Sequence, residues 1–524
     1  MNGAVAAGSK ITAEAGAAML RAGGNAVDAA VAACFATAAG EPVLTSLAGG
    51  GAMLVRSAAS GEVTVCDFFA DAPGLGGRAP EGLEFFPAEL AFGSATQAFH
   101  IGAGAAAVPG VIPGLCQALE RWGRLSLAEV TAPACRLLRA GVPLEPLQAH
   151  FFQVLRPILL HTAAGRRQFG RDGQLLAAGD CYRVPQLAEL LEELARGPWR
   201  QVYDLLLGEP ALGQFGPAAG GLLGREDWDA YRVAFRRPLR IDYRGTTMYT
   251  NPPPAAGGTL VALMLSLLEG EDGAVLCRRD PERVHALCRA MRVADESRRD
   301  GAEALGLDAW QERFRDLAGH PLGRVAAPRG GPPNTTHISV VDGDGNAAAA
   351  TFSYGEGNGH LLGDTGIMMN NLMGEADLFP EGFHRWPPGR RLSTMMSPSI
   401  LERPDGSLVV LGSGGANRIR TAVTQVVCRL VDCGDAPAAA VAAPRVHFEA
   451  GVLNAETSGW PSGSTFLAEL GAAEFLAFPE PNLFFGGVHV VERAADGSVR
   501  GAGDPRRGGA CVVVQAARRC PAAG

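Results

Sequence analysis

Hydrophobic and polar positions follow helical spacing in several stretches of the chain. Residues 26–38 form an Ala-rich apolar segment that Asn25 can cap, which predicts a buried helix. Residues 185–195 carry leucines at helical spacing against glutamates, the pattern of an amphipathic helix. The other predicted helices span residues 10–21, residues 199–207, a buried segment from Thr259 and a charged surface helix over residues 281–299.

Strand patterns flank short turns at two places. Residues 47–55 run from a glycine triplet into a strand, with residues 63–68 as its hairpin partner. Later, β-branched residues begin at Thr335, residues 342–346 have turn composition, and residues 347–352 return as a second strand. Thr335 therefore begins a strand where a Gly/Pro-rich segment ends. The composition of that segment, from His320 onward, is typical of an exposed, mobile stretch.

The composition is that of a well-buried globular protein. Of the 524 residues, 47% are hydrophobic and 19% are charged, and the formal net charge is −8. The basic residues are scattered, so we expect neither a nucleic-acid nor a membrane surface. The length allows two or three domains or one large unit. Composition alone predicts only an α/β or α+β protein.

The cysteines and the start of the chain indicate a reducing compartment. The eleven cysteines share no C-x-x-C spacing, and we expect them to be small core residues. The first residues lack the basic start, apolar core and small-residue cleavage site of a signal peptide. We therefore expect a cytoplasmic enzyme.

Several candidate features have ordinary structural explanations. Thr335 and Thr336 suit any strand, because threonine is common there. The glycine triplet at 49–51 lacks a phosphate-binding spacing, so close backbone packing is expected. His337 and His447 have no second ligand at metal spacing and are expected to be structural. We expect no metal and no cofactor.

The stretch from Asn334 to Asp342, together with residues 365–371, resembles the γ-glutamyltransferase family. Further landmarks occur in the family's order, so that the resemblance covers nearly the whole chain: residues 23–30, 108–110, 243–245, 252–258 and 504–509. It implies an α+β protein with the four-layer αββα sandwich of the N-terminal nucleophile hydrolases. It also implies a precursor cut between Asn334 and Thr335. The large part, residues 1–334, and the small part, residues 335–524, would stay associated as one intertwined domain.

In that family the first Thr of Thr-Thr-His is the nucleophile, which here is Thr335. A hydroxyl is a weak nucleophile and needs a base beside it. The α-amine of an N-terminal Thr titrates near 7.7–8.0 in model peptides and can accept the proton. In the uncut chain this nitrogen is an amide, so the Asn334–Thr335 bond has to break first.

The resemblance assigns further catalytic positions. Ser353 matches a Thr whose hydroxyl lies near the nucleophile. The loop at 412–418 matches the family's oxyanion loop, although alone it reads as a plain turn. Its two N–H donors map to Gly415 and Ala416, and an Ala is tolerable there if its φ is negative.

The expected substrate contacts are partly altered. Residues 390–398 resemble the family's Leu-Ser-Ser-Met-Ser-Pro motif but contain one extra Met, so the alignment has two possible registers. If the motif is aligned from its N-terminal side, Ser393 and Thr394 match the family's two serines. Thr394 matches a serine in either register. Glu375 keeps the carboxylate that binds the substrate ammonium. Phe69 stands where the family has an Arg for the α-carboxylate of the glutamyl group, and a Phe cannot replace a guanidinium. Gly355 and Leu372 replace an Asn and a Gln.

Three functions are considered at this point. The leading hypothesis is a γ-glutamyl hydrolase or transferase that acts on γ-glutamyl amides such as glutathione, with water, an amino acid or a peptide as acceptor. The second is an acylase of the same mechanism with a non-glutamyl donor, which the loss of the Arg favours. The third is an inactive binding protein with the same fold, which the intact Thr335, Ser353 and Gly415 argue against. The sequence leaves the acyl donor, the acceptor and the oligomeric state open.

Overall fold

The computed structural model describes residues 3–77, 80–92, 95–278, 280–300, 312–313, 315–316, 334–379, 382–458, 470 and 472–515. The Gly/Pro-rich segment before Thr335 lies outside the described residues, so its mobility stays a prediction.

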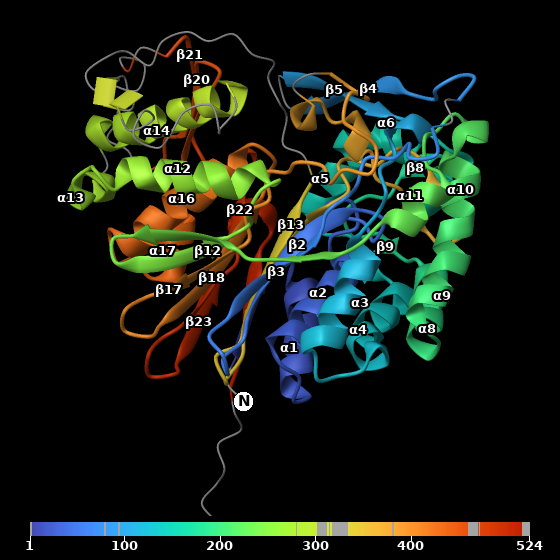
Figure 1. Cartoon of the computed structure of the whole chain (residues 1–524), viewed down its shortest axis with the longest axis horizontal. Coiled ribbons are helices and arrows are strands. Elements are labelled where there is room, and N and C mark those ends of the chain that lie inside the picture. Colours follow the sequence, from blue (N-terminus) through green and yellow to red (C-terminus); the bar gives the residue numbers. More distant parts are fainter. Residues whose placement is uncertain are drawn as a thin grey trace, which may run out of the picture.

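Two antiparallel sheets pack face to face at the centre of the molecule (Figure 1). The first has seven strands, in the order β10 (Ala234–Arg236), β3 (Val63–Phe68), β2 (Gly50–Arg56), β14 (Ala347–Ser353), β13 (Thr336–Val341), β1 (Gly3–Ala7) and β24 (Ala510–Val514). The second has six, in the order β11 (Leu239–Tyr243), β12 (Thr246–Thr250), β17 (Ser399–Glu402), β18 (Leu408–Gly414), β22 (Gly487–Arg493) and β23 (Val499–Ala502). Each sheet contains strands from before and from after Thr335, and β1 lies between β13 and β24.

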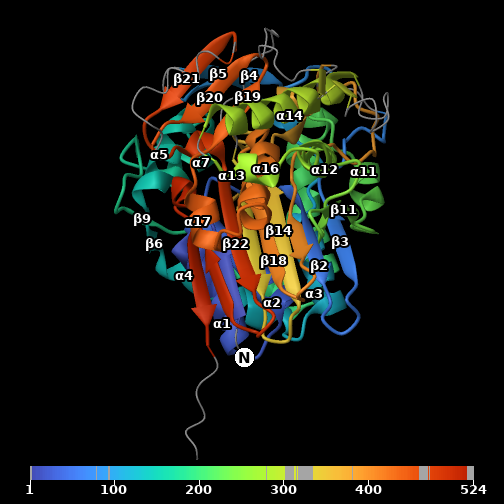
Figure 2. The ribbon, with the colours of Figure 1, turned by 90° about the vertical axis from the view of Figure 1, so that its left-hand side faces the viewer.

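Helices cover the outer face of each sheet, so the layers run helix, sheet, sheet, helix (Figures 1 and 2). On the seven-stranded sheet lie α1 (Lys10–Arg21), α2 (Ala26–Gly40) and α3 (Val111–Trp122), and α4 (Leu127–Ala140) packs on α2. On the six-stranded sheet lie α12 (Ala256–Leu268), α16 (Arg418–Val431) and α17 (Pro437–Ala442). The predicted four-layer αββα architecture is confirmed.

Smaller elements surround these layers. The further helices are α5 (Pro146–Val154), α6 (Arg156–Leu159), α7 (Ala163–Phe169), α8 (Pro185–Arg196), α9 (Trp199–Tyr203), α10 (Glu209–Phe215), α11 (Arg225–Ala230), α13 (Gly273–Cys277) and α14 (Pro281–Asp300). The further strands are β4 (Phe86–Phe92), β5 (Ala95–Ile101), β6 (Val142–Pro143), β7 (Gly170–Arg171), β8 (Gln174–Leu175), β9 (Cys181–Tyr182), β15 (Leu361–Leu362), β16 (Ile367–Met368), β19 (Val446–Glu449), β20 (Val452–Glu456) and β21 (Glu474–Phe478). Among the described residues, no helix combines the length and the apolar character needed to cross a bilayer.

The hairpin predicted after Thr335 is present as β13 and β14. Thr336 pairs with Phe352, and the carboxylate of Asp342 accepts the backbone N–H of Asp344 at 3.0 Å and of Asn346 at 2.9 Å, which closes the turn. Thr335 directly precedes β13 near the middle of the sheet.

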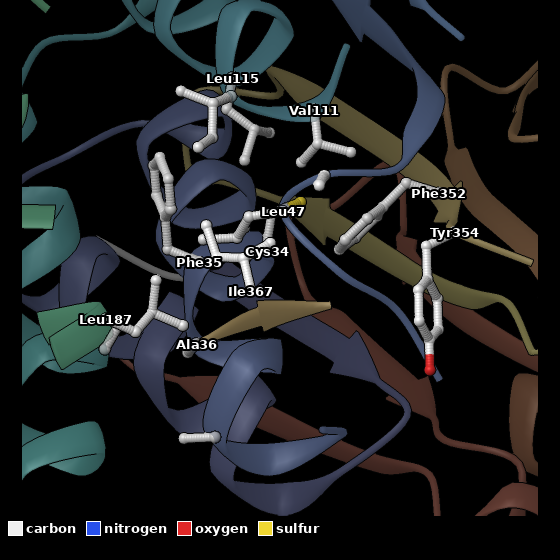
Figure 3. Packing of buried hydrophobic residues seen from close by; sticks show 14 of the residues in the cluster. Cys34, Phe35, Ala36, Leu47, Val111, Leu115, Leu187, Phe352, Tyr354 and Ile367 are labelled. Carbon is white, nitrogen blue, oxygen red and sulfur yellow. The ribbon is translucent and has the colours of Figure 1, made fainter. Parts of the chain in front are cut away.

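Side chains of the hairpin alternate between two cores, as the period of a strand requires. The even-numbered residues of β14, such as Phe352, point to the helical layer, where Figure 3 shows Phe352 and Tyr354 near the residues of α2. The odd-numbered ones face the other sheet across a core of small residues that includes Ala347 and Ala349. Such small side chains let the two sheets approach closely.

The helix α14 differs from its prediction as a charged surface helix. Its apolar face, with Val284, Leu287 and Met291, is buried against α12 and β19. Two arginines are buried with it: Arg283 donates to a backbone carbonyl at 3.0 Å, and Arg289 donates to the Glu271 carboxylate at 2.7 Å. Long basic side chains lie along the apolar surface and still find partners, which the charge pattern alone does not reveal.

The cysteine expectation holds for most positions but misses one pair. Cys277 and Cys433 form a disulfide with a Cα–Cα distance of 5.4 Å. The other described cysteines are free, and most of them are buried. The two cysteines are 156 residues apart in the sequence, so no local spacing indicated the pair.

The cap of α2 is more extensive than the sequence indicated. Asn25 caps the helix as predicted, and the fully buried Asp28 completes a capping box by accepting the Asn25 N–H at 2.7 Å. The same carboxylate accepts the backbone N–H groups of Arg124 at 2.9 Å and Leu125 at 3.0 Å. Asp28 therefore fixes the start of α2 to the start of α4.

We expect Asp28→Ala to destabilise the fold, because it leaves several buried N–H groups without an acceptor. The loss should be at least the roughly 1–3 kcal/mol that one unsatisfied buried group costs. Chemical unfolding measures it. Glu14→Ala, which removes only an exposed ion pair, is the control and should cost less than about 1 kcal/mol. Equal effects of the two substitutions would contradict the anchoring role of Asp28.

Candidate functional site

The peptide bond between Asn334 and Thr335 is intact and buried in the structure. The hydroxyl of Ser353, at the end of β14, donates a hydrogen bond to the carbonyl oxygen of Asn334. The backbone N–H of Gly355 in turn donates to the Ser353 oxygen at 3.1 Å. Ser353 therefore holds the carbonyl that the neighbouring Thr335 hydroxyl would attack.

Glycines allow other backbone segments to approach this bond. A Cβ atom on Gly414, the last residue of β18, would lie 2.1 Å from the Thr335 carbonyl oxygen. A Cβ on Gly49 would lie 2.1 Å from the Ser353 carbonyl oxygen. Real Cβ atoms do not approach so closely, so both positions require glycine. The packing role expected for the glycine triplet is confirmed.

The loop after β18 has an unexpected conformation. Gly415 has a φ of 122° and Ala416 a φ of 44°. From the sequence, an Ala is acceptable at position 416 on the condition that its φ is negative, and this condition is not met. A left-handed conformation is unfavourable for an Ala and persists only where the surroundings impose it. Ala416 lies at the wall of the pocket beside Thr335.

A pocket beside Thr335 brings together most of the predicted site residues. Its lining contains Phe69, Thr335, Ser353, Leu372, Glu375, Asp377, Leu378, Thr394, Met395, Met396, Ala416, Asn417 and Ile419. Thr394 lines the pocket and Ser393 does not. Thr394 is also the residue that matches the family motif in both possible registers. In the uncut chain its volume is only about 30 Å³, roughly the share of one water molecule in the liquid.

Glu375 is the acidic group of the pocket. It is buried, and its Oε1 has no hydrogen-bond partner among the described residues. Burial, and then the charge of Asp377, raises the pKa of Glu375 to about 8. A Cβ on Gly355 would lie 2.3 Å from Glu375 Oε1, so the family's Asn does not fit here without rearrangement.

Among the described residues that line the pocket, none is basic, so none of them replaces the family's Arg at Phe69. Phe69 is buried in an apolar cluster with Leu372 and Met396. The nearby Arg391 is fully engaged: it donates to Asp67 at 2.7 Å and to Asp71 at 2.6 Å. This wall of the pocket is therefore apolar.

Sequence reasoning missed three buried charged residues around the scissile bond. The Oε1 atom of Glu356 accepts the Asn334 N–H at 3.3 Å, and Glu41 accepts from Thr336. Burial raises the pKa of both carboxyl groups. The guanidinium of Arg507 is buried without a hydrogen-bond partner among the described residues, and burial lowers its pKa to about 10. Arg507 lies in the 504–509 landmark, which was the only sequence signal for any of them.

The two histidines behave as expected. His337 is fully buried, and its ring nitrogens contact Thr351 Oγ1 at 2.7 Å and Ser339 Oγ at 2.8 Å. Burial lowers the pKa of His337 well below its usual value. His447 contacts Thr421 Oγ1 at 3.0 Å. Both are held inside the fold as hydrogen-bonding core residues.

Comparisons with known proteins agree with this geometry. A scan against protein-family models matches Gamma-glutamyltranspeptidase over residues 12–514. The chain is 32% identical to the Acylase ACY 1 proenzyme of Pseudomonas sp. (strain V22), covering 98% of this chain and 93% of that protein. It is 30% identical to the Glutathione hydrolase proenzyme of Escherichia coli (strain K12), covering 93% and 87%. The crystal structure of cephalosporin acylase from Bacillus halodurans has the same fold, with a TM-score of 0.78 at 24% identity over 98% and 95% of the two chains. The chain therefore belongs to the γ-glutamyltranspeptidase family and is an enzyme of that hydrolase and transferase type.

Proposed function

We propose that the chain is the precursor of an N-terminal-threonine acylase, an amide hydrolase that cuts itself before Thr335 and does not require a carboxylate on its acyl group. The observation that carries the proposal is the contact of the Ser353 hydroxyl with the Asn334 carbonyl, beside a pocket whose Phe69 wall is apolar. The proenzyme names of the relatives support the cleavage, and an acylase among them supports the donor class.

The proposed cleavage uses the hydroxyl of Thr335 and the carbonyl of Asn334, which Ser353 contacts. The Thr335 Oγ attacks the Asn334 carbonyl carbon while Ser353 stabilises the negative charge that develops on the oxygen. The C–N bond breaks, the acyl group moves to Oγ as an ester, and the nitrogen becomes a free amine. Water then hydrolyses the ester, releasing the Asn334 carboxylate and the Thr335 hydroxyl.

The mature enzyme would repeat the chemistry on an external amide. The Thr335 amine accepts the hydroxyl proton as Oγ attacks the substrate carbonyl, and it then protonates the leaving amine. The N–H groups of Gly415 and Ala416 are proposed to stabilise the oxyanion. Water, or an amine acceptor, completes the cycle by attacking the ester on Thr335.

A γ-glutamyl hydrolase is the second candidate, favoured by Glu375. Its unpartnered carboxyl in the pocket is suited to a substrate ammonium. The glutathione hydrolase among the relatives supports the same donor. The engagement of Arg391 with Asp67 and Asp71 counts against it, because a glutamyl α-carboxylate then finds no cation at the Phe69 wall.

We expect the wild-type chain to mature into residues 1–334 and 335–524, and Thr335→Ala to stay whole. Ser353→Ala should slow the cut by up to the roughly 100- to 1,000-fold that one oxyanion donor contributes. Denaturing gels and intact mass measure both. Ser339→Ala, which removes another buried hydroxyl of the same sheet, should cleave at the wild-type rate. An active wild type that remains a single chain would sink the mechanism.

A second prediction concerns the acyl group. Phe69→Arg should raise kcat/KM for a γ-glutamyl anilide, relative to an acyl anilide without the α-carboxylate, because it supplies the missing cation. A charged hydrogen bond is worth roughly 1.5–3 kcal/mol, or about 10- to 150-fold. Phe69→Leu is the control and should give no such gain. If the wild type already prefers the γ-glutamyl donor strongly, the acylase assignment fails.

A third prediction uses the pKa of Glu375, raised by burial to about 8. Below that pH the group is a neutral acid that can donate to an uncharged acyl group, and above it the group is a carboxylate that attracts an ammonium. As pH rises through about 8, we expect KM to increase for an uncharged acyl anilide and to decrease for one that bears a trimethylammonium group, whose charge does not change with pH. Glu375→Gln should remove both trends. Parallel trends for the two substrates would show that Glu375 does not contact the acyl group.

A further inference from the structure

Three potential metal ligands meet outside the Thr335 pocket. One ligand atom each from Glu84, His161 and His360 lies within 4.8 Å of the other two. None of the three residues lines the pocket. Glu84 precedes β4, His161 follows α6, and His360 lies in the loop between β14 and β15. They are far apart in the sequence, so no ligand spacing could have indicated them.

The hydrogen bonds at this cluster are incomplete. His360 Nε2 is buried and lies 3.3 Å from Glu84 Oε1, yet it makes no hydrogen bond of acceptable geometry with any described residue. An unsatisfied buried nitrogen costs roughly 1–3 kcal/mol. A cation placed between the three side chains would satisfy this nitrogen and the Glu84 oxygen together.

The ligands are held in place by a second layer of contacts. The other carboxylate oxygen of Glu84 accepts the backbone N–H of Ala103 at 2.8 Å. The backbone N–H of His360 donates to Asn358 Oδ1 at 2.9 Å. Such outer contacts orient metal ligands in known sites.

The rings of His161 and His360 contact each other because Gly359, the residue before His360, has no side chain. Their centroids are 5.4 Å apart. Gly359 has a φ of 90°, and a Cβ on it would lie 3.0 Å from the His161 ring. The absence of a side chain at Gly359 therefore lets both rings lie beside Glu84.

We propose that Glu84, His161 and His360 bind one divalent first-row transition ion, with Zn²⁺ as the best match. Two imidazoles and a carboxylate suit Zn²⁺, which leaves a fourth position for water. Mg²⁺ and Ca²⁺ prefer sites made of oxygen ligands alone.

The ion would join the two parts of the chain. Glu84 and His161 precede the Asn334–Thr335 bond, whereas His360 follows it, in the loop that begins after Ser353 and carries Glu356. If the chain is cut as proposed above, the ion links the two fragments and fixes this loop. Only this role rests on the proposed function; ion binding itself does not.

The test is a titration of the purified, EDTA-dialysed enzyme with Co²⁺ as a spectroscopic probe, followed by displacement with Zn²⁺. We expect one ion per chain, visible Co²⁺ absorption bands of a low-coordinate site, and a higher Tm in Zn²⁺. His360→Gln and Glu84→Gln should each weaken binding by at least the roughly 10- to 100-fold that loss of an outer contact costs. His150→Gln, at an exposed histidine of α5, should leave binding unchanged.

Circular dichroism would establish that the variants fold, and Glu84→Gln keeps an acceptor for Ala103. The proposal is overturned if no stoichiometric Co²⁺ spectrum appears, or if both variants bind Co²⁺ like the wild type. It is also overturned if Zn²⁺ raises the Tm of the variants as much as that of the wild type. A chain that binds one ion but is never cut at Thr335 would retain the site and refute only the cleavage.

Discussion

The close approach of several backbones around the Asn334–Thr335 peptide is the constraint on which the site depends. Gly414 comes from the six-stranded sheet and Gly49 from the loop before β2, and neither position has room for a Cβ. The small residues between the sheets, such as Ala347 and Ala349, permit this approach. As a result Asn334 and Thr335 are buried, and the Asn334 carbonyl accepts a hydrogen bond from the Ser353 hydroxyl.

The same burial sets the electrostatics of the site. Glu356 and Glu375 have raised pKa values chiefly because water is excluded from them. Cleavage would create an amine at Thr335 in this region, where acidic groups raise the pKa of an amine and burial lowers it. The basicity of Thr335 therefore depends on the balance between these two effects. An exposed terminus would have neither influence.

Local patterns predicted much of the fold, and long-range contacts limited the rest. The hairpin after Thr335 and the Asn25 cap depend on residues a few positions apart, so they were correct. The burial of α14 depends on α12 and β19, which its own charges do not show. The left-handed φ of Ala416 has no signal in the local sequence.

The candidate site likewise contains residues that the sequence predicted and residues that only the fold brings together. The resemblance proposed Thr335, Ser353 and Thr394 as site residues, and the fold brings all three to the lining of one pocket. The buried charges of Glu41 and Arg507 come from opposite ends of the chain, and only the fold brings them near the scissile bond.

The substrate pocket shows how several substitutions can act together. Phe69 stands in place of the family's Arg, so that cation is missing from the pocket. Arg391 lies near this part of the pocket, but its charge is paired with the carboxylates of Asp67 and Asp71. Gly355 leaves space for Glu375 on the opposite side, where burial keeps the acid mostly neutral at pH 7. A carboxylate brought into this pocket would lose its hydration without gaining a cation, a cost of several kcal/mol for a buried ion. An uncharged acyl group would avoid that cost and could contact Phe69 and Leu372, which both line the pocket. Desolvation, together with the missing arginine, is therefore the physical basis of the acylase proposal.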